Sequence, residues 1–336
     1  MTGRSTRRSL AAEGERLALP DGFSVDQGAI FPCADATERV QAEPGRLIAA
    51  VCMAAAHGLH VGRETADLLT AGAPALRGLP PARRGELLLE LVLCPVPDAA
   101  VDLAQRAGLL GQILPDIDRL RAMPKGQGRY KDVYVHTLRV LAATPADPIT
   151  RVAALLHDIA KPDTLVSEGG LVHFPNHDLL GADRSERRLH GLGFDAAFSA
   201  AVATLVRLHL RTNSYEPNWT DSAVRRLHLD AGEHWQRLLD LSDADVTSAR
   251  PEVVARARRR VQALAEHARL LDQPVEVSPL DGTVLMQRFG RGPGRWIGEV
   301  KRELIARVRE GTLDPADHKA AWRIAAEVVD ALPAGE

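Results

Sequence analysis

The sequence has few cysteines and no long apolar segment, and each shortage excludes a class of protein. Its 336 residues include three cysteines, Cys33, Cys52 and Cys94, far apart and without CxxC spacing. We therefore expect reduced thiols and no thiolate zinc site. No apolar run is long enough to span a membrane, and residues 1–22 lack the apolar core of a signal peptide. These absences predict a cytoplasmic protein with no membrane contact.

The sequence also lacks a large excess of either positive or negative charge. The formal net charge is −2, and the sequence pI is about 6.6. No global basic field therefore indicates nucleic acid, and we expect a small molecule rather than a nucleic acid as partner. The oligomeric state stays open.

Helical periodicity is abundant, whereas alternating strand patterns are nearly missing. Segments such as "GRLIAAVCMAAAHGL" and "RRGELLLELVL" place Ala and Leu at helical spacing between Gly and Pro. The best strand candidate, "GLVHFP", is short. The pattern predicts an all-α protein with four segments: a flexible tail over 1–20, a helical front module over 21–124, a central domain over 125–250 and a C-terminal helical module over 251–336.

Ionisable residues interrupt the apolar stripes of several predicted helices. In "DVYVHTLRVLAA", His136 shares a face with Val133 and Val140, and "ALLHDIAKPDT" places a His–Asp doublet at the end of an apolar run. Burying such groups costs several kcal/mol each unless something neutralises them. A divalent cation does so directly, because imidazole and carboxylate are its ordinary ligands. The candidate ligands are His136, His157, Asp158, His177, His209 and Asp245.

One such histidine alone is more often a satisfied core residue than a ligand. Their joint occurrence on separate helices favours a metal centre. Six nitrogen and oxygen donors suffice for one metal ion or a close pair. Mg, Mn, Fe, Co, Ni and Zn are all compatible with this donor set.

The motifs that carry these residues resemble a known family. "DVYVHTL", "RVAALLHDIAKP", "HFPNHDLLGA" and "LVRLHLR" resemble the HD-domain metal-dependent phosphohydrolase superfamily. More specifically, they are similar to the HD-containing C-terminal half of bacterial tRNA nucleotidyltransferases and poly(A) polymerases. "EPGRLIAAVCMAAAHGL" is similar to the neck of that family, and the resemblance extends over residues 22–312. It implies an HD helical core over 125–250, a neck-like module before it and a helical module after it.

The same resemblance shows two departures. Only the largely polar residues 1–21 precede the region of neck similarity. In the family, a longer nucleotide-adding head with paired aspartates precedes the neck. Within the neck, Ala49 and Cys52 stand where arginines are expected. We therefore expect no nucleotide-adding activity.

The resemblance implies hydrolysis of a phosphate ester by metal-activated water. We expect a phosphomonoesterase or nucleotidase acting on a small phosphomonoester, above all a nucleoside monophosphate, with cyclic phosphodiesters in the same class. In this scheme His136, His157, Asp158 and Asp245 hold the principal metal. His177 and His209 hold a second metal or contact the phosphate. The expected catalytic residues are Asp158, Lys161, His177 and His209, and the expected phosphate contacts are Lys161, Arg184 and Arg211.

Two other functions remain open from the residues. Six ligands also permit a di-iron centre that oxidises its substrate with O₂. The run "RARRR" over 256–260 permits a non-catalytic RNA-binding remnant, although its arginines occupy several faces of one helix. Salt-dependent RNA binding without metal would favour the latter.

Overall fold

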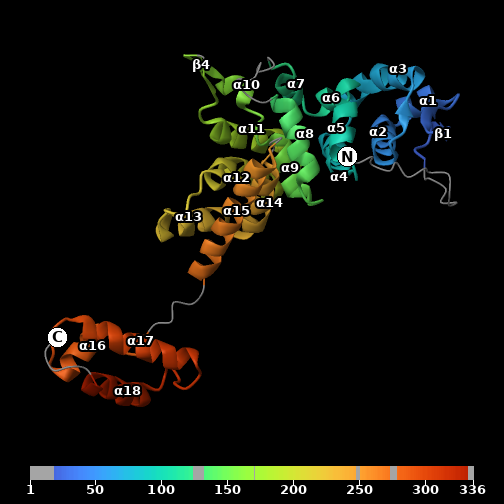
Figure 1. Ribbon diagram of the computed structural model, residues 1–336. Helices are drawn as coiled ribbons and strands as arrows, with labels where there is room; N and C mark the ends of the chain where they lie inside the picture. The colour runs from blue at the N-terminus through green and yellow to red at the C-terminus, as the bar shows by residue number, and fades with distance from the viewer. Residues whose placement is uncertain (1–18, 124–131, 170, 247–249, 273–277, 332–336) are drawn as a thin grey trace, which may run out of the picture. The chain divides into compact units, whose positions relative to one another are not determined.

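The computed structural model describes residues 19–123, 132–169, 171–246, 250–272 and 278–331. Helices account for most of these residues, and the strands are few and short (Figure 1), which confirms the predicted all-α class. By internal contacts the chain divides into two compact units, Met1–Ala268 and Arg269–Glu336. The finer division of the first unit into a neck-like and an HD module stays a prediction. Cys33, Cys52 and Cys94 are free thiols.

The first unit begins with a small sheet that the sequence pattern did not indicate. Strands β1 (Phe23–Asp26) and β2 (Ala29–Pro32) pair antiparallel, and β3 (His60–Val61) joins β2 in parallel. The hairpin loop consists of Gln27 and Gly28, which have φ values of 44° and 75°. A two-residue loop with both φ values positive matches the right-handed twist of the strands. Strands of two to four residues are too short to show a readable alternation.

Seven α-helices and one 3₁₀ helix follow up to residue 121. Proline occupies the first helical position of α4 and α5, where its missing N–H is not needed. Gly58, with φ of 62°, ends α2 in the left-handed conformation. The elements are α1 (Ala36–Ala42), α2 (Arg46–His57), α3 (Arg63–Gly72), η1 (Ala73–Gly78), α4 (Pro81–Leu93), α5 (Pro97–Arg106), α6 (Leu110–Ile113) and α7 (Asp116–Arg121).

The central part of the first unit is a group of packed helices. Asp132, Asp147 and Asp195 each accept a backbone N–H at a helix start, and so fix where α8, α9 and α12 begin. Helix α9 contacts α8, α12 and α14, and α14 also contacts α8 and α12 (Figure 1). The elements are α8 (Val133–Ala143), α9 (Pro148–Leu156), α10 (Lys161–Thr164), β4 (Val166–Glu168), β5 (Leu171–His173), α11 (His177–Gly191), α12 (Ala196–Asn213), α13 (Asp221–Ala231), η2 (Gly232–His234), α14 (Trp235–Ala244) and α15 (Pro251–Asp272), whose last four residues are assigned to the second unit.

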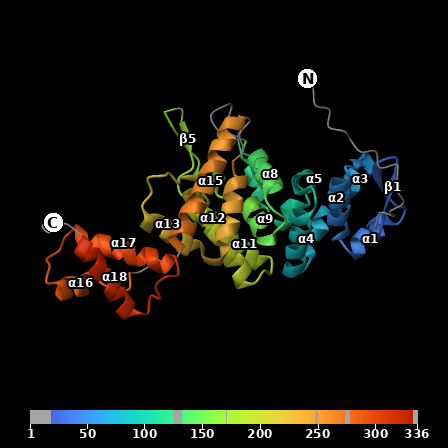
Figure 2. The ribbon, with the colours of Figure 1, turned by 60° about the horizontal axis from the view of Figure 1, so that its bottom comes forward.

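The second unit contains α16 (Gly282–Phe289), α17 (Arg295–Arg309) and α18 (His318–Ala331) (Figure 2). Its core is apolar, with Leu285, Val300 and Leu304 fully buried. Across the described residues of both units, no helix combines the length and the apolar composition needed to cross a lipid bilayer.

Candidate metal centre

Two histidines reach the core from the middle and the end of apolar helix faces. His136 lies on α8, with buried Val133 and Val140 one turn before and after it. His209 lies near the end of α12, and it follows buried Val202 and Leu205. Both imidazoles are buried, as the apolar stripe around them requires.

The His–Asp doublet lies in a turn rather than within a helix. Helix α9 ends at Leu156, and residues 157–160 form the turn that leads to α10. A turn allows the two neighbouring side chains to point to the same side of the chain. His157 and Asp158 are each 1% exposed. Pro162 lies in the first turn of α10, directly after this turn, where its missing N–H is not needed.

Asp245 completes the first group of donors. It follows α14 directly, after buried Leu238 and Leu241. Its Oδ1 lies 2.9 Å from His136 Nε2. His136 Nε2 lies 3.2 Å from His157 Nε2. These three side chains therefore offer one oxygen and two nitrogens within 4.8 Å of one another.

A second group is formed by Asp158, His177 and His209, whose donor atoms also lie within 4.8 Å of one another. His177 is the first residue of α11, after Asn176 in the left-handed conformation with φ of 56°. The two oxygens of Asp158 point to different groups: Oδ2 lies 3.2 Å from His157 Nε2, and Oδ1 lies 3.4 Å from His177 Nε2. The structure thus brings all six candidate ligands together.

Three of the imidazoles are oriented by the backbone. His157 Nδ1 lies 2.8 Å from the Ala154 carbonyl oxygen, His177 Nδ1 2.7 Å from that of Phe174, and His209 Nδ1 2.6 Å from that of Val206. A carbonyl only accepts, so each Nδ1 carries the proton and donates it. In its neutral form, each of these imidazoles therefore keeps an Nε2 lone pair that points into the cluster, the arrangement common among metal-ligating histidines.

Burial and neighbouring charges set the protonation of the cluster. Burial lowers the pKa of His209 to about 4, and it also lowers the pKa of His136. Burial acts to raise the pKa of Asp245, but the hydrogen bond with His136 outweighs it and the pKa falls below its usual range. For His157, burial is outweighed by the Asp158 carboxylate, which raises the pKa. These shifts favour neutral imidazole at His136 and His209 and a charged carboxylate at Asp245.

The donor set fits a divalent cation. Within the described residues, Asp158 Oδ1 and His177 Nε2 are buried and have no hydrogen-bond partner. Leaving such groups unsatisfied costs about 1–3 kcal/mol each. Nitrogen and carboxylate oxygen are suitable ligands for first-row divalent ions, so a cation between these atoms would remove the cost.

The predicted phosphate contacts take different places. Lys161 Nζ donates to Asp158 Oδ2 at 2.7 Å and lies 5.2 Å from the centre of the Phe174 ring, at the edge of the cluster. Arg184 pairs with Asp163 and Arg211 pairs with Asp230. Lys161 therefore lies beside the candidate ligands, whereas the two arginines form ion pairs with acids outside that group. Their contact with phosphate stays a prediction.

Asn213 is a site residue that the sequence analysis missed. Its side-chain amide donates to Asp245 Oδ2. Asn213 follows His209 by four residues on α12, so both lie on one helix face. That spacing is the sequence signal that indicates Asn213 as a neighbour of the site. Its partner Asp245 is 32 residues away, so the spacing does not reveal the hydrogen bond.

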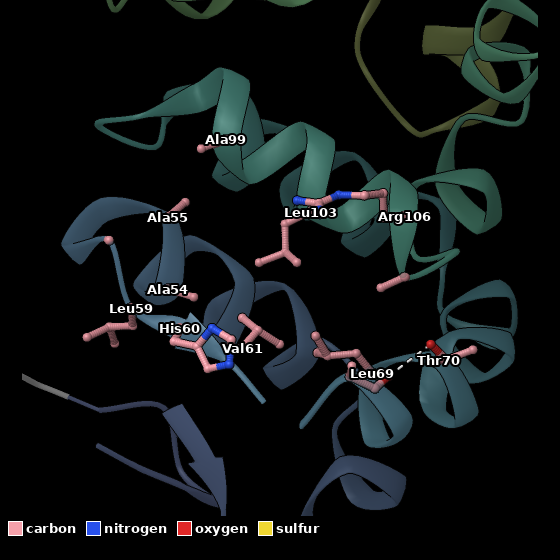
Figure 3. Close-up of a pocket in the computed structure, with 13 residues that line it drawn as sticks. Ala54, Ala55, Leu59, His60, Val61, Leu69, Thr70, Ala99, Leu103 and Arg106 are labelled. Carbon is pink, nitrogen blue, oxygen red and sulfur yellow. Dashed lines mark hydrogen bonds between the residues drawn. The ribbon is translucent and has the colours of Figure 1, made fainter. Parts of the chain in front are cut away.

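A separate cavity of about 530 Å³ lies between α2, α3 and α5 (Figure 3). Its lining is mostly small and apolar, with Ala54, Leu69 and Leu103 among the wall residues. Arg106, one of its two basic lining residues, is already paired with Asp102 at 3.0 Å. This cavity lacks a cluster of donors for a metal ion, so the His–Asp cluster is the stronger candidate site.

Comparison with known proteins places this geometry in a family context. The HD domain family matches residues 133–250. The CC-adding tRNA nucleotidyltransferase of Thermus thermophilus is 29% identical over 290 residues, 82% of this chain and 65% of the relative. The A-adding tRNA nucleotidyltransferase of Deinococcus radiodurans is 31% identical over 221 residues, 62% of this chain and 50% of the relative. The crystal structure of the Bacillus stearothermophilus CCA-adding enzyme in complex with CTP has a TM-score of 0.44 and 17% identity, covering 90% of this chain and 65% of that one.

These relatives overturn two predictions. We expected a phosphohydrolase of small phosphomonoesters without nucleotide addition, and the relatives are named for adding nucleotides to tRNA. We also expected no nucleic-acid partner, which is wrong for the same reason. A net charge of −2 sums the whole chain and does not report where arginines gather. The chain spans about half to two thirds of the length of these relatives.

The order of the His and Asp motifs, their convergence in one core and the matched family agree with the predicted resemblance. Residues 133–250, which contain all six candidate ligands, match the HD domain family, and the chain is similar to tRNA nucleotidyltransferases of two bacteria.

Proposed function

We propose that this chain takes part in the addition of nucleotides to tRNA, and that it binds tRNA while its HD centre holds a divalent metal ion. The observation that carries the proposal is the extent of the similarity to a CC-adding tRNA nucleotidyltransferase. That similarity covers 82% of the chain and so continues well beyond the HD domain at 133–250. A shared HD domain alone would not give similarity of this length.

The test uses the full chain with tRNA transcripts that lack the terminal CCA or end in CC. CTP, ATP and Mg²⁺ are supplied, and extension is followed at single-nucleotide resolution on a denaturing gel. Binding of the same transcripts is measured by fluorescence anisotropy. We expect binding together with extension. Binding without extension would restrict the chain to holding tRNA and refute its part in catalysis, and the absence of both would overturn the proposal as a whole.

For the metal centre, we propose that His136, His157 and Asp245 hold one ion and that Asp158 bridges to a second one held by His177 and His209. The bridge is supported by the geometry of Asp158, whose two oxygens lie 3.2 Å and 3.4 Å from imidazoles of the two groups. Asn213 orients Asp245 through its amide. Metal content by mass spectrometry after loading with Mn²⁺ or Co²⁺ tests this directly, and a content of zero would refute it.

A second candidate function is metal-dependent hydrolysis of a phosphoester on RNA at the same centre. The supporting observation is the buried, unsatisfied Asp158 Oδ1 and His177 Nε2, which fit a metal of the kind used by HD hydrolases. A bound divalent ion lowers the pKa of a coordinated water towards about 7. Lys161, next to Asp158, would neutralise a phosphate oxygen. Release of phosphate or nucleotide from tRNA by the metal-loaded protein supports this candidate, and its absence with every metal opposes it.

A further inference from the structure

Four arginines line one cavity of about 370 Å³ in the first unit, away from the metal centre. Arg77 comes from η1, Arg84 from α4, and Arg187 and Arg188 from near the end of α11. The other walls come from α6 and the residues beside it, including Gln112. No acidic residue is among those that line the cavity. We call it the arginine pocket.

A close approach of α4 to the segment after α11 brings these arginines together. Gly85 on α4 lies so near this segment that an added Cβ would be 2.6 Å from the carbonyl oxygen of Leu192. Gly193, with φ of 80°, packs against Ala82 in the same contact. The absence of a side chain at both glycines therefore lets Arg84 and Arg188 face the same cavity.

The positive charge in the pocket is only partly balanced. Arg188 pairs with the buried Asp116, its Nε lying 2.6 Å from the carboxylate. Arg187 donates to the carbonyl of Asp183 in its own helix. None of the described acidic side chains pairs with Arg77 or Arg84, and Arg84 Nε is buried there without a hydrogen-bond partner. The nearby Asp118 accepts from Gln105.

We propose that the arginine pocket binds a phosphate group of RNA. Guanidinium groups match phosphate oxygens with two parallel hydrogen bonds, and several of them around one cavity favour an anion over a neutral ligand. The buried Nε of Arg84 gains an acceptor when phosphate enters. Because similar charges converge here, binding of an anion also relieves their repulsion.

Helix α11 connects this pocket to the metal centre. It begins with His177 and carries Arg187 about 15 Å further along its axis. One RNA molecule can therefore place one phosphate in the pocket and another near the centre. The choice of RNA rests on the proposed tRNA function, whereas the phosphate chemistry of the pocket does not.

The test compares two double variants with the same change in charge. Arg77→Glu/Arg187→Glu reverses two exposed pocket arginines that pair with none of the described acidic side chains. Arg63→Glu/Arg226→Glu reverses two exposed arginines on α3 and α13. Binding of fluorescent tRNA is measured at about 50 and 200 mM KCl. The pocket variant should bind at least about tenfold more weakly, with a salt slope smaller by about two. The control variant should stay near wild type, and circular dichroism melting checks that both fold.

A second measurement separates RNA from free phosphate. Inorganic phosphate and pyrophosphate are titrated against the thermal unfolding of wild type and both variants. Protection that only the pocket variant loses, without a change in tRNA binding, would identify free phosphate as the ligand instead of RNA. If the two variants have equal tRNA affinity, equal salt slope and equal phosphate response, the proposal that the arginine pocket binds phosphate is wrong. If wild type fails to bind tRNA, the proposed function fails, while the phosphate titration still decides whether the pocket binds an anion.

Discussion

The two units of the chain have cores of opposite character. In the second unit, Leu285, Val300 and Leu304 are fully buried among other apolar side chains, and Ser278 is the one buried polar residue among those described there. Its Trp296 satisfies its indole N–H on the Gly292 carbonyl at 2.9 Å. In the first unit, His157, Asp158 and His209 lie in the core with 1% exposure. Helical periodicity builds both cores, so periodicity alone does not reveal chemistry.

The difference teaches where to look for function. An apolar core gains free energy from each buried side chain. A core that contains several ionisable groups gives up part of that gain, and natural proteins accept this mainly at functional sites. The comparison predicts that substitutions in the two cores have separable effects.

The largest expected effect follows from Asp158→Ala. This change removes the carboxylate whose oxygens face both groups of donors. Loss of residues that only support metal ligands weakens metal binding about 10–100-fold, so loss of a bridging ligand should exceed about 100-fold. Isothermal titration with Mn²⁺ measures it.

Asp243→Ala is the matched control, because Asp243 is a half-buried carboxylate two residues before Asp245 and pairs with Arg258. It should bind Mn²⁺ as wild type does. Similar Mn²⁺ affinities of the two variants would show that Asp158 is not a metal ligand. The two cores would then not differ in the way proposed.

Leu304→Ala should be the next largest change, confined to the second unit. Leu304 is fully buried there, and such truncations cost about 2–5 kcal/mol of unfolding free energy. Hydrogen exchange should become faster across residues 278–331, while Mn²⁺ affinity is unchanged. Val284→Ala, at a position 44% exposed in the same unit, should cost under about 0.5 kcal/mol. Loss of metal binding in Leu304→Ala would show that the two cores are not independent.

The smallest expected effect comes from Asn213→Ala. The amide of Asn213 holds Asp245 in place without belonging to the donor groups. Its removal should weaken Mn²⁺ binding about tenfold, as for other partners of metal ligands. Asn218→Ala, at an exposed asparagine after the same helix, should have no effect. A null result at Asn213 would mean that the packing of α14 alone positions Asp245.

Local pattern predicted much of the fold and the candidate site. His136 and His209 were recognisable because each falls on the stripe of its own helix, and the helix starts follow from single residues such as Asp132 and Pro81. Contacts between distant segments were not readable in the same way. The Gln27–Gly28 hairpin has strands too short to show alternation, and the hydrogen bond from Asn213 to Asp245 depends on how α12 packs on α14. The gathering of Arg84 and Arg188 likewise arises only when α4 meets the end of α11.

The three backbone-anchored imidazoles share one further property. Each imidazole donates to the carbonyl three residues before it, so local backbone geometry sets its orientation. The accepting residues are Ala154, Phe174 and Val206. Folding alone therefore positions the donor atoms of these imidazoles, before a metal ion binds. Metal exchange by dialysis, under native conditions and without refolding, should therefore be feasible for this protein.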